Sequence, residues 1–122
     1  MGSSHVDGTR PPWYNVTTNG NVRGMRFEWD EVKNGRNLRK HKISFETAKM
    51  VFDDPHALSD REREVDDEER WQAVGVIVGS VTVVVAYTYR QEDRGEVIRI
   101  ISARKASPAE RRAYEEGQWP LG

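Results

Sequence analysis

The sequence has no cysteine, which excludes disulfide scaffolds, cysteine-ligated zinc and thiol catalysis. No apolar run approaches the roughly 18 residues of a membrane-spanning helix, and the chain has no glycine-rich phosphate-binding loop. Histidine is scarce, with three residues, and no Gly-x-Ser-x-Gly elbow accompanies them, so nothing indicates a Ser-His-Asp hydrolase. The histidines and carboxylates also lack the spacing of metal ligands. We therefore expect no metal, no cofactor and no membrane contact.

The 122 residues have the length of one domain, and four tryptophans, four tyrosines and a valine-rich stretch supply a core. Residues 1–24 are rich in Gly, Ser, Thr, Asn and Pro and show no hydrophobic periodicity. We expect them to be a disordered leader of the kind that an expression vector adds. The folded domain is then expected over residues 25–117, followed by a short tail at 118–122.

Charge is distributed in blocks, although the whole chain has a net charge of −1. The segment Asp60–Glu69 holds seven acidic residues and two arginines, a net charge of −5. The segment Arg70–Tyr114 holds eight basic and four acidic residues, a net charge of +4. An acidic segment beside a basic one indicates a binding surface for an anion, or simply a solvated turn beside a soluble surface.

The N-terminal part of the domain predicts a strand and two helices. Alternating apolar residues over Met25–Trp29 are typical of a half-buried strand. Asp30 is a suitable N-cap for a helix over Glu31–His41. Ser44 is a second N-cap, for a helix that ends near Asp53. A short strand is expected over residues 57–59, before an acidic turn.

A β-hairpin is the clearest predicted element. Its strands, Arg70–Val78 and Val81–Arg90, are rich in β-branched and aromatic residues, and Gly79-Ser80 suits a two-residue turn. The turn predicts the pairs Val74 with Val85, Gln72 with Tyr87 and Arg70 with Tyr89. One face would then carry Arg70, Gln72, Tyr87 and Tyr89 together at the open end of the hairpin.

A third strand over Val97–Arg104 and a final helix complete the predicted fold. Arg99 and Arg104 have opposite parity, so they lie on opposite faces unless a β-bulge intervenes. Ser107, Pro108 and Glu110 form a helix start. The order predicts an α+β domain in which two N-terminal helices and one C-terminal helix pack on an antiparallel β-meander.

Arginines on the predicted strands are the strongest candidates for a binding site in this sequence. Four arginines occupy predicted strand positions: Arg70, Arg90, Arg99 and Arg104. The guanidinium group is always charged and presents a rigid fork to phosphate oxygens. Beside Tyr87 and Tyr89, these arginines would suit a polyanion with stackable bases. The alternative is that they pair with Glu69, Glu92 or Glu110, or face solvent.

The first helix carries a second polar set. Lys33, Asn37, Lys40 and His41 lie on one stripe of the predicted helix. Histidine titrates near neutral pH, so His41 is the best general acid or base of the domain. The alternative is that His41 caps the carbonyl groups at the end of the helix.

Three segments in a fixed order resemble the BrnT family of bacterial ribonuclease toxins. They are FEWDEVKNGRNLRKHKISFETAKMVFDDP, EERWQAVG and RIISARKASPAERRAYEE. The resemblance spans Phe27–Glu116, almost the whole predicted domain. Lys42 departs from the family, which commonly has glycine after the helix, so a left-handed cap there would be costlier.

The resemblance implies a RelE-like fold, a metal-independent endoribonuclease that inhibits translation, and pairing with a BrnA-type antitoxin whose complex represses its own operon. Family roles would fall on Lys33, Asn37, His41, Arg70, Arg99 and Arg104. We expect a cytoplasmic protein, because nothing in the sequence points to secretion. DNA binding is expected to reside in the antitoxin, because this chain has no helix-turn-helix pattern.

Metal-free RNA cleavage requires deprotonation of the ribose 2′-OH, stabilisation of charge on the phosphoryl group and protonation of the leaving 5′ oxygen. The expected catalytic residues are Lys33, His41, Arg70, Arg99 and Arg104, and the expected RNA contacts are Asn37, Tyr87, Tyr89 and Arg90. The alternative is a non-catalytic RNA- or protein-binding module of the same fold.

Overall fold

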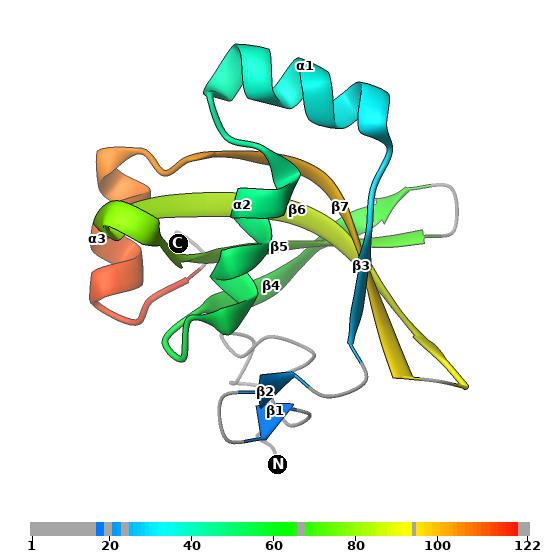
Figure 1. Ribbon diagram of the computed structural model, residues 1–122. Helices are drawn as coiled ribbons and strands as arrows, with labels where there is room; N and C mark the ends of the chain where they lie inside the picture. Colours follow the sequence, from blue (N-terminus) through cyan, green and yellow to red (C-terminus); the bar gives the residue numbers. More distant parts are fainter. Residues whose placement is uncertain (1–16, 19–20, 23–24, 66–67, 94, 120–122) are drawn as a thin grey trace.

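The computed structural model describes residues 17–18, 21–22, 25–65, 68–93 and 95–119 (Figure 1). Its centre is a five-stranded sheet in the order β3-β7-β6-β5-β4. The strands are β3 (Arg26–Glu28), β4 (Leu58–Val65), β5 (Glu68–Ile77), β6 (Val81–Glu92) and β7 (Gly95–Lys105). Strands β4 to β7 pair antiparallel with their neighbours, whereas β3 runs parallel to β7. The expected α+β class is confirmed, but the sheet is mixed and not antiparallel throughout.

The two ends of the chain are described only in part. Within residues 1–24, the structure describes β1 (Thr17–Thr18) and β2 (Asn21–Val22), which pair antiparallel. The remaining residues of the expected leader lie outside the described residues. The expected tail is described as far as Trp119, whose side chain is 3% exposed and packs beside α3 (Pro108–Glu115). No helix of the described ranges is long and apolar enough to cross a membrane.

Helix α1 (Glu31–His41) has the predicted boundaries. The Asp30 carboxylate accepts the N–H groups of Val32 and Lys33 at 2.8 and 3.3 Å, which fixes the start of the helix. At the other end, Lys42 takes the left-handed conformation at φ 63° and its N–H bonds to the Leu38 carbonyl at 2.9 Å. Glycine is favoured in this conformation. The lysine therefore forms the glycine-type cap, at a cost of about 1 kcal/mol.

The second predicted helix is divided into two kinds of helix. Ser44 caps α2 (Phe45–Ala48) by accepting the Thr47 N–H at 3.1 Å, as predicted. The chain then tightens into the 3₁₀ helix η3 (Lys49–Asp53). Such tightening is frequent at the ends of helices. It keeps Val51 and Phe52 buried in the core.

Strand β4 is longer than the predicted strand over residues 57–59. The acidic segment pairs with β5 as far as Val65 instead of forming a turn from Asp60 onward. β4 is the edge of the sheet. Charged residues are common on edge strands, where the ladder to one neighbour supplies the stability. Residues 66 and 67, the centre of the expected acidic turn, lie outside the described residues.

The predicted register of the β5–β6 hairpin is wrong by one residue. Ile77 pairs with Val81, so that Val78, Gly79 and Ser80 form a three-residue loop, with Gly79 at φ 79° and Ser80 at φ 60°. Val78, which we expected to be paired, is 66% exposed. A shift of one residue moves one strand's side chains to the other face relative to its partner. Arg70 consequently pairs with Thr88 and not with Tyr89.

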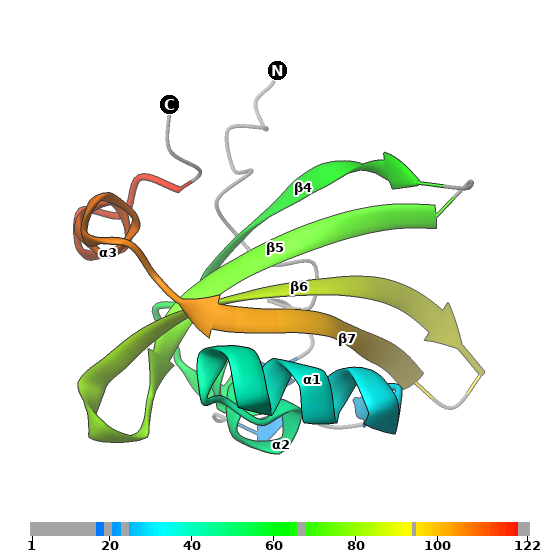
Figure 2. The same ribbon diagram turned by 90° about the horizontal axis from the view of Figure 1, so that it is seen from above.

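The sheet separates two hydrophobic clusters. Helices α1 and α2 lie toward one side, as seen from above (Figure 2), where α1 runs beside β7. The larger cluster lies there, and its completely buried members include Phe45, Val85 and Tyr87. On the other face, α3 covers the part of the sheet that carries Val74 and Val84. Beyond Val74 and Val84, the paired positions on that face carry polar residues such as Gln72, Arg70 and Thr88.

Candidate functional site

A β-bulge in β7 decides which face the basic residues occupy. Ala86 pairs with Ser102 and Tyr87 with Ile100, so Ile101 has no partner on β6. The extra residue reverses the alternation of side chains beyond it. Arg99 and Arg104 therefore share one face of the sheet. Their opposite parity in the sequence permits this arrangement only because a bulge lies between them. Arg70 lies on this same face, because it pairs with Thr88 and Thr88 pairs with Arg99.

Four residues form a row across the sheet on this face. Arg70 on β5, Thr88 on β6, Arg99 on β7 and Glu28 on β3 occupy successive paired positions. Neighbouring strands are about 4.8 Å apart, so the backbones of the two arginines are roughly 10 Å apart. The next row contains Gln72, Ala86 and Ser102. We call the part of these two rows on β5, β6 and β7 the polar face, made of Arg70, Gln72, Ala86, Thr88, Arg99 and Ser102; Glu28 on β3 borders it.

Two of the predicted arginines join a network of ions at the β3 end of the polar face. Arg99 Nη1 lies 3.3 Å from Glu28, which also accepts a hydrogen bond from Arg90 at 3.2 Å. Arg90 Nε donates to Glu92 at 2.7 Å. Hydrogen bonds from Arg90 lower the pKa values of both Glu28 and Glu92 below their usual range. The predicted alternative of carboxylate pairing is thus confirmed for Arg90 with Glu92.

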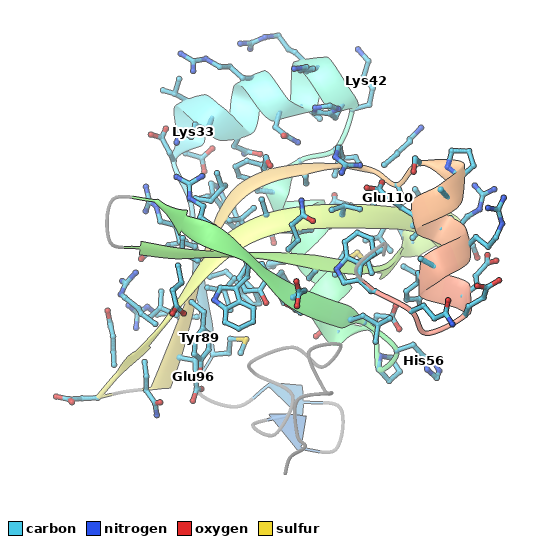
Figure 3. All side chains as sticks on the ribbon, turned by 180° about the vertical axis from the view of Figure 1, so that it is seen from behind. Lys33, Lys42, His56, Tyr89, Glu96 and Glu110 are labelled. Carbon is cyan, nitrogen blue, oxygen red and sulfur yellow. The ribbon has the colours of Figure 1, made fainter. Side chains whose placement is uncertain are left out.

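Arg104 forms a two-bond pair with Glu110, and this pair joins the end of β7 to α3. Figure 3 labels Glu110 at the start of α3. The two terminal nitrogens of Arg104 donate to the two carboxylate oxygens at 2.7 and 2.9 Å. Glu110 also accepts the Ser107 N–H, completing the capping box of α3. The bond from Arg104, followed by the bonds at Ser107, lowers the pKa of Glu110 to about 2 despite burial, which acts in the opposite direction. The Arg104 guanidinium is therefore engaged in the fold.

Arg70 is the arginine of the polar face with a donor that the fold leaves unused. Its Nε is buried and makes no hydrogen bond within the described residues. A buried donor without an acceptor costs about 1–3 kcal/mol. Such a group at a surface site is satisfied when an anion binds there, and phosphate oxygens are strong acceptors for guanidinium groups.

A shallow groove of about 210 Å³ lies between α1 and β7. It is lined by Lys33, Arg36, Asn37, Lys40, His41, Ile101 and Ser102. Ser102 belongs to the polar face as well, so the groove borders it. Among the residues that the structure describes, no carboxylate lines the groove, and its cationic side chains make it a site of positive potential. The predicted stripe of Lys33, Asn37 and His41 thus lies along one groove.

Asn37 holds this groove together. Its amide nitrogen donates to the carbonyls of Ala103 and Ile43 at 2.8 and 3.0 Å, and its oxygen accepts the Ala103 N–H at 3.1 Å. Strand β3 pairs with β7 only as far as Arg99. The Asn37 amide therefore takes the place of a strand at the uncovered edge of β7. With 7% exposure and these bonds, its side chain positions α1.

The two predicted tyrosines do not lie beside the arginines. Tyr87 is completely buried, and its hydroxyl shares a hydrogen bond of 2.6 Å with Ser59. The expectation that Tyr87 stacks on a base is therefore wrong for this structure. Tyr89 is half-buried on the same helix-covered face, near Glu96 (Figure 3), and burial, together with Glu96, raises its pKa. Both expectations depended on the incorrect hairpin register.

Sequence reasoning missed several members of the site. Thr88 and Ser102 are contributed to the polar face by pairing and by the bulge, which no local pattern reveals. Arg36 could have been found, because it lies three residues from Lys33 on the same helix. Outside the site, the sequence did not reveal the structural role of Asp54, which accepts the Tyr114 hydroxyl at 2.6 Å and the Val76 N–H at 2.8 Å and so connects η3, α3 and β5.

Comparison with known proteins identifies the family. A sequence model described as "Ribonuclease toxin, BrnT, of type II toxin-antitoxin system" matches residues 29–110. The 1.1 Å crystal structure of the Brucella abortus ribonuclease toxin BrnT is similar, with 25% identity, a TM-score of 0.48 and coverage of 68% of this chain and 97% of that one. No curated protein sequence matches the chain significantly. Since the family model covers most of the domain, the chain belongs to the BrnT family of ribonuclease toxins of type II toxin–antitoxin systems.

Proposed function

We propose that the chain is a metal-independent endoribonuclease that binds RNA across the polar face and the α1–β7 groove and inhibits translation by cutting it. The observation that carries this proposal is the row Arg70–Thr88–Arg99, in which two guanidinium groups flank a small hydroxyl side chain on neighbouring strands. The Nε of Arg70 in this row is buried without an acceptor among the described residues. A phosphodiester group would supply that acceptor.

The proposed reaction is attack of the ribose 2′ oxygen on the adjacent phosphorus. The 2′ O–H proton passes to a base, a bond forms between the 2′ oxygen and phosphorus, and the bond to the 5′ oxygen of the next nucleotide breaks. That oxygen takes up a proton, leaving a 2′,3′-cyclic phosphate and a 5′ hydroxyl. No metal ion is needed for this balance of atoms and charges.

The residues of the site suit different parts of this reaction. Arg70 and Arg99 would stabilise the charge that develops on the phosphoryl oxygens. His41, half-buried in the groove, would be the group that transfers a proton. Lys33 would bind a neighbouring phosphate in the groove. Arg104 and Asn37 would act by positioning α3 and α1.

We further propose that the fold is of the RelE type, that a BrnA-type antitoxin inhibits the toxin in the cytoplasm, and that operator DNA is bound by the antitoxin. The family implies a protein antitoxin and an RNA target. To test whether the antitoxin alone binds DNA, operator binding is measured with this chain by itself and with its partner. Specific nanomolar operator binding by this chain alone would contradict this assignment of DNA binding to the antitoxin.

The deciding experiment is RNA cleavage by the purified chain in EDTA, with single-stranded RNA as substrate. We expect products ending in a 2′,3′-cyclic phosphate. Arg70→Ala should abolish them, whereas Arg111→Ala, which changes an exposed arginine on α3, should not. If the unaltered chain binds the RNA but leaves it intact, the chain is a non-catalytic RNA-binding module. If it neither binds nor cuts, the polar face is not an RNA site.

A further inference from the structure

The two aliphatic side chains of α1 lie at the surface of the protein. Val32 is 63% exposed and Leu38 is 47% exposed, and the helix has no other aliphatic residue. A helix at the surface of a domain normally turns its apolar residues toward the core. Here the contacts to the core are made by amides: Asn37 is the buried residue of α1, and Asn34 Oδ1 accepts the Phe45 N–H at 2.8 Å. The usual orientation of the helix is thus inverted.

The exposed aliphatic residues frame a gap in the helix surface. Val32, Gly35 and Leu38 are spaced by three residues, so each lies about 60° from the next around the helix axis. A Cβ added at Gly35 would have only Arg39 Nη1 within 4 Å, at 3.6 Å, apart from its own helix backbone and chain neighbours. We call Val32, Gly35 and Leu38 the α1 notch: two apolar side chains beside a position without one. Groove residues such as Lys33 and Lys40 lie on another side of the helix.

We propose that the α1 notch is the docking site of the protein antitoxin, and that the antitoxin segment that docks there is an amphipathic helix with acidic flanks. This inference rests on the antitoxin partner named under the proposed function. Gly35 has no side chain, and the group nearest to its missing Cβ is the flexible end of Arg39, at 3.6 Å. An apolar side chain of the partner that displaces this end would lie between Val32 and Leu38. Buried apolar anchors of this kind dominate the energy of interfaces.

The charge around the α1 notch favours an acidic partner over the two other occupants. Residues 31–42 hold Glu31 and five cationic residues, Lys33, Arg36, Arg39, Lys40 and Lys42, a net charge of +4. A second copy of the chain would bring two such helices together, and like charges would repel. RNA would match the charge, but aliphatic side chains offer bases no aromatic ring to stack on. An acidic, partly apolar protein segment matches both the positive charge of α1 and its exposed aliphatic side chains.

Docking at the α1 notch would also explain inhibition without using the catalytic residues. A helix held on α1 lies beside the α1–β7 groove, and its acidic flank would compete with RNA phosphates for Lys33 and Lys40. The notch residues themselves line neither the groove nor the polar face. Substitution of Val32 or Leu38 should therefore release the inhibitor and leave cleavage by the free chain intact.

The test uses the full chain and the protein encoded by the neighbouring gene. Binding is measured by calorimetry at low and high salt, and RNA cleavage is measured in EDTA with and without that protein. Val32→Glu, Leu38→Glu and Gly35→Gln should each weaken binding by at least roughly 30-fold, the effect of losing one dominant contact. Val78→Glu is the matched control, because Val78 is 66% exposed on the distant β5–β6 loop. It should change binding less than about threefold.

Several outcomes would overturn the proposal. The first is that the neighbour-encoded protein does not bind the unaltered chain. The second is that Val78→Glu weakens binding as much as the notch variants do. The third is that the notch variants lose RNA cleavage while their binding of the neighbour-encoded protein is unchanged. Loss of self-association by the variants in sedimentation, with antitoxin binding retained, would assign the notch to a second copy instead. If the unaltered chain does not cut RNA but binds the neighbour-encoded protein, and the notch variants weaken that binding, only the proposed enzymatic activity is contradicted.

Discussion

Asn37 and Ala103 are joined by two hydrogen bonds of opposite direction, 2.8 Å from the side-chain nitrogen to the carbonyl and 3.1 Å from the backbone N–H to the side-chain oxygen. A single side chain thereby fastens a very polar helix to the edge of a sheet. Few apolar contacts replace this link, because the aliphatic residues of α1 face solvent. The Asn37 amide is thus the side-chain link that joins α1 to β7 beside the groove.

Asn37→Leu should destabilise the protein by about 2–4 kcal/mol, because it leaves buried N–H and carbonyl groups of Ala103 and the Ile43 carbonyl without partners. Denaturant unfolding measures this change. Arg39→Ala, at an exposed position of the same helix, is the control and should change the free energy of unfolding by less than about 0.5 kcal/mol. An equal loss in the two variants would show that Asn37 has no special role.

Arg70→Ala and Arg104→Ala should differ, although the sequence grouped them together. Arg70→Ala should reduce RNA cleavage at least roughly 100-fold, because a phosphate contact is lost, with little change in the thermal transition. Arg104→Ala should lower stability by about 1–3 kcal/mol, because Glu110 loses its partner. Cleavage rates and melting temperatures of both variants test this. A large loss of stability in Arg70→Ala would make that arginine structural as well.

The Arg104–Glu110 pair predicts a loss of stability in acid. The folded-state pKa of Glu110 is about 2, against 4.5 for the free side chain. A carboxyl group whose pKa is lowered by folding stabilises the protein above its unfolded pKa, and this contribution disappears as the pH falls from 4.5 toward 2. Because Arg104 is 40% exposed, solvent reduces the effect to about 1–2 kcal/mol.

The difference between the unaltered chain and Glu110→Gln isolates this contribution. Glutamine retains the capping box but cannot ionise. The free-energy difference between the two proteins should be constant above pH 5 and shrink through the window between pH 4.5 and 2. A difference that does not change with pH would contradict the role assigned to the charge of Glu110.

Lys42→Gly should stabilise the protein by about 0.5–1 kcal/mol, because glycine adopts the left-handed cap at φ 63° without the steric cost that lysine carries. Arg39→Gly, inside the helix, should destabilise it by about 1 kcal/mol. Thermal or denaturant unfolding of both variants gives the comparison. If both glycines destabilise equally, the cap conformation is not strained.

Local chemistry determined the elements of this protein. Asp30, Ser44 and Ser107 mark helix starts because their side chains satisfy N–H groups only two or three residues away, so sequence alone places them. The order of the three sequence motifs likewise pointed to the correct family, because motifs are recognised from the sequence without any structure. The polar stripe of α1 was also visible, since helical periodicity is a local property.

Tertiary structure decided how the elements face one another. The loop at residues 78–80 shifts the hairpin register by one residue, and the bulge at Ile101 adds one residue to β7. Because side chains alternate between the two faces of a sheet, each of these changes moves all the following side chains of a strand to the opposite face relative to its partner. Together they remove Tyr87 and Tyr89 from the arginine face and bring Arg70, Arg99 and Arg104 onto it. Ladder bonds and packing across the sheet select these registers, and they join residues that are distant in the sequence.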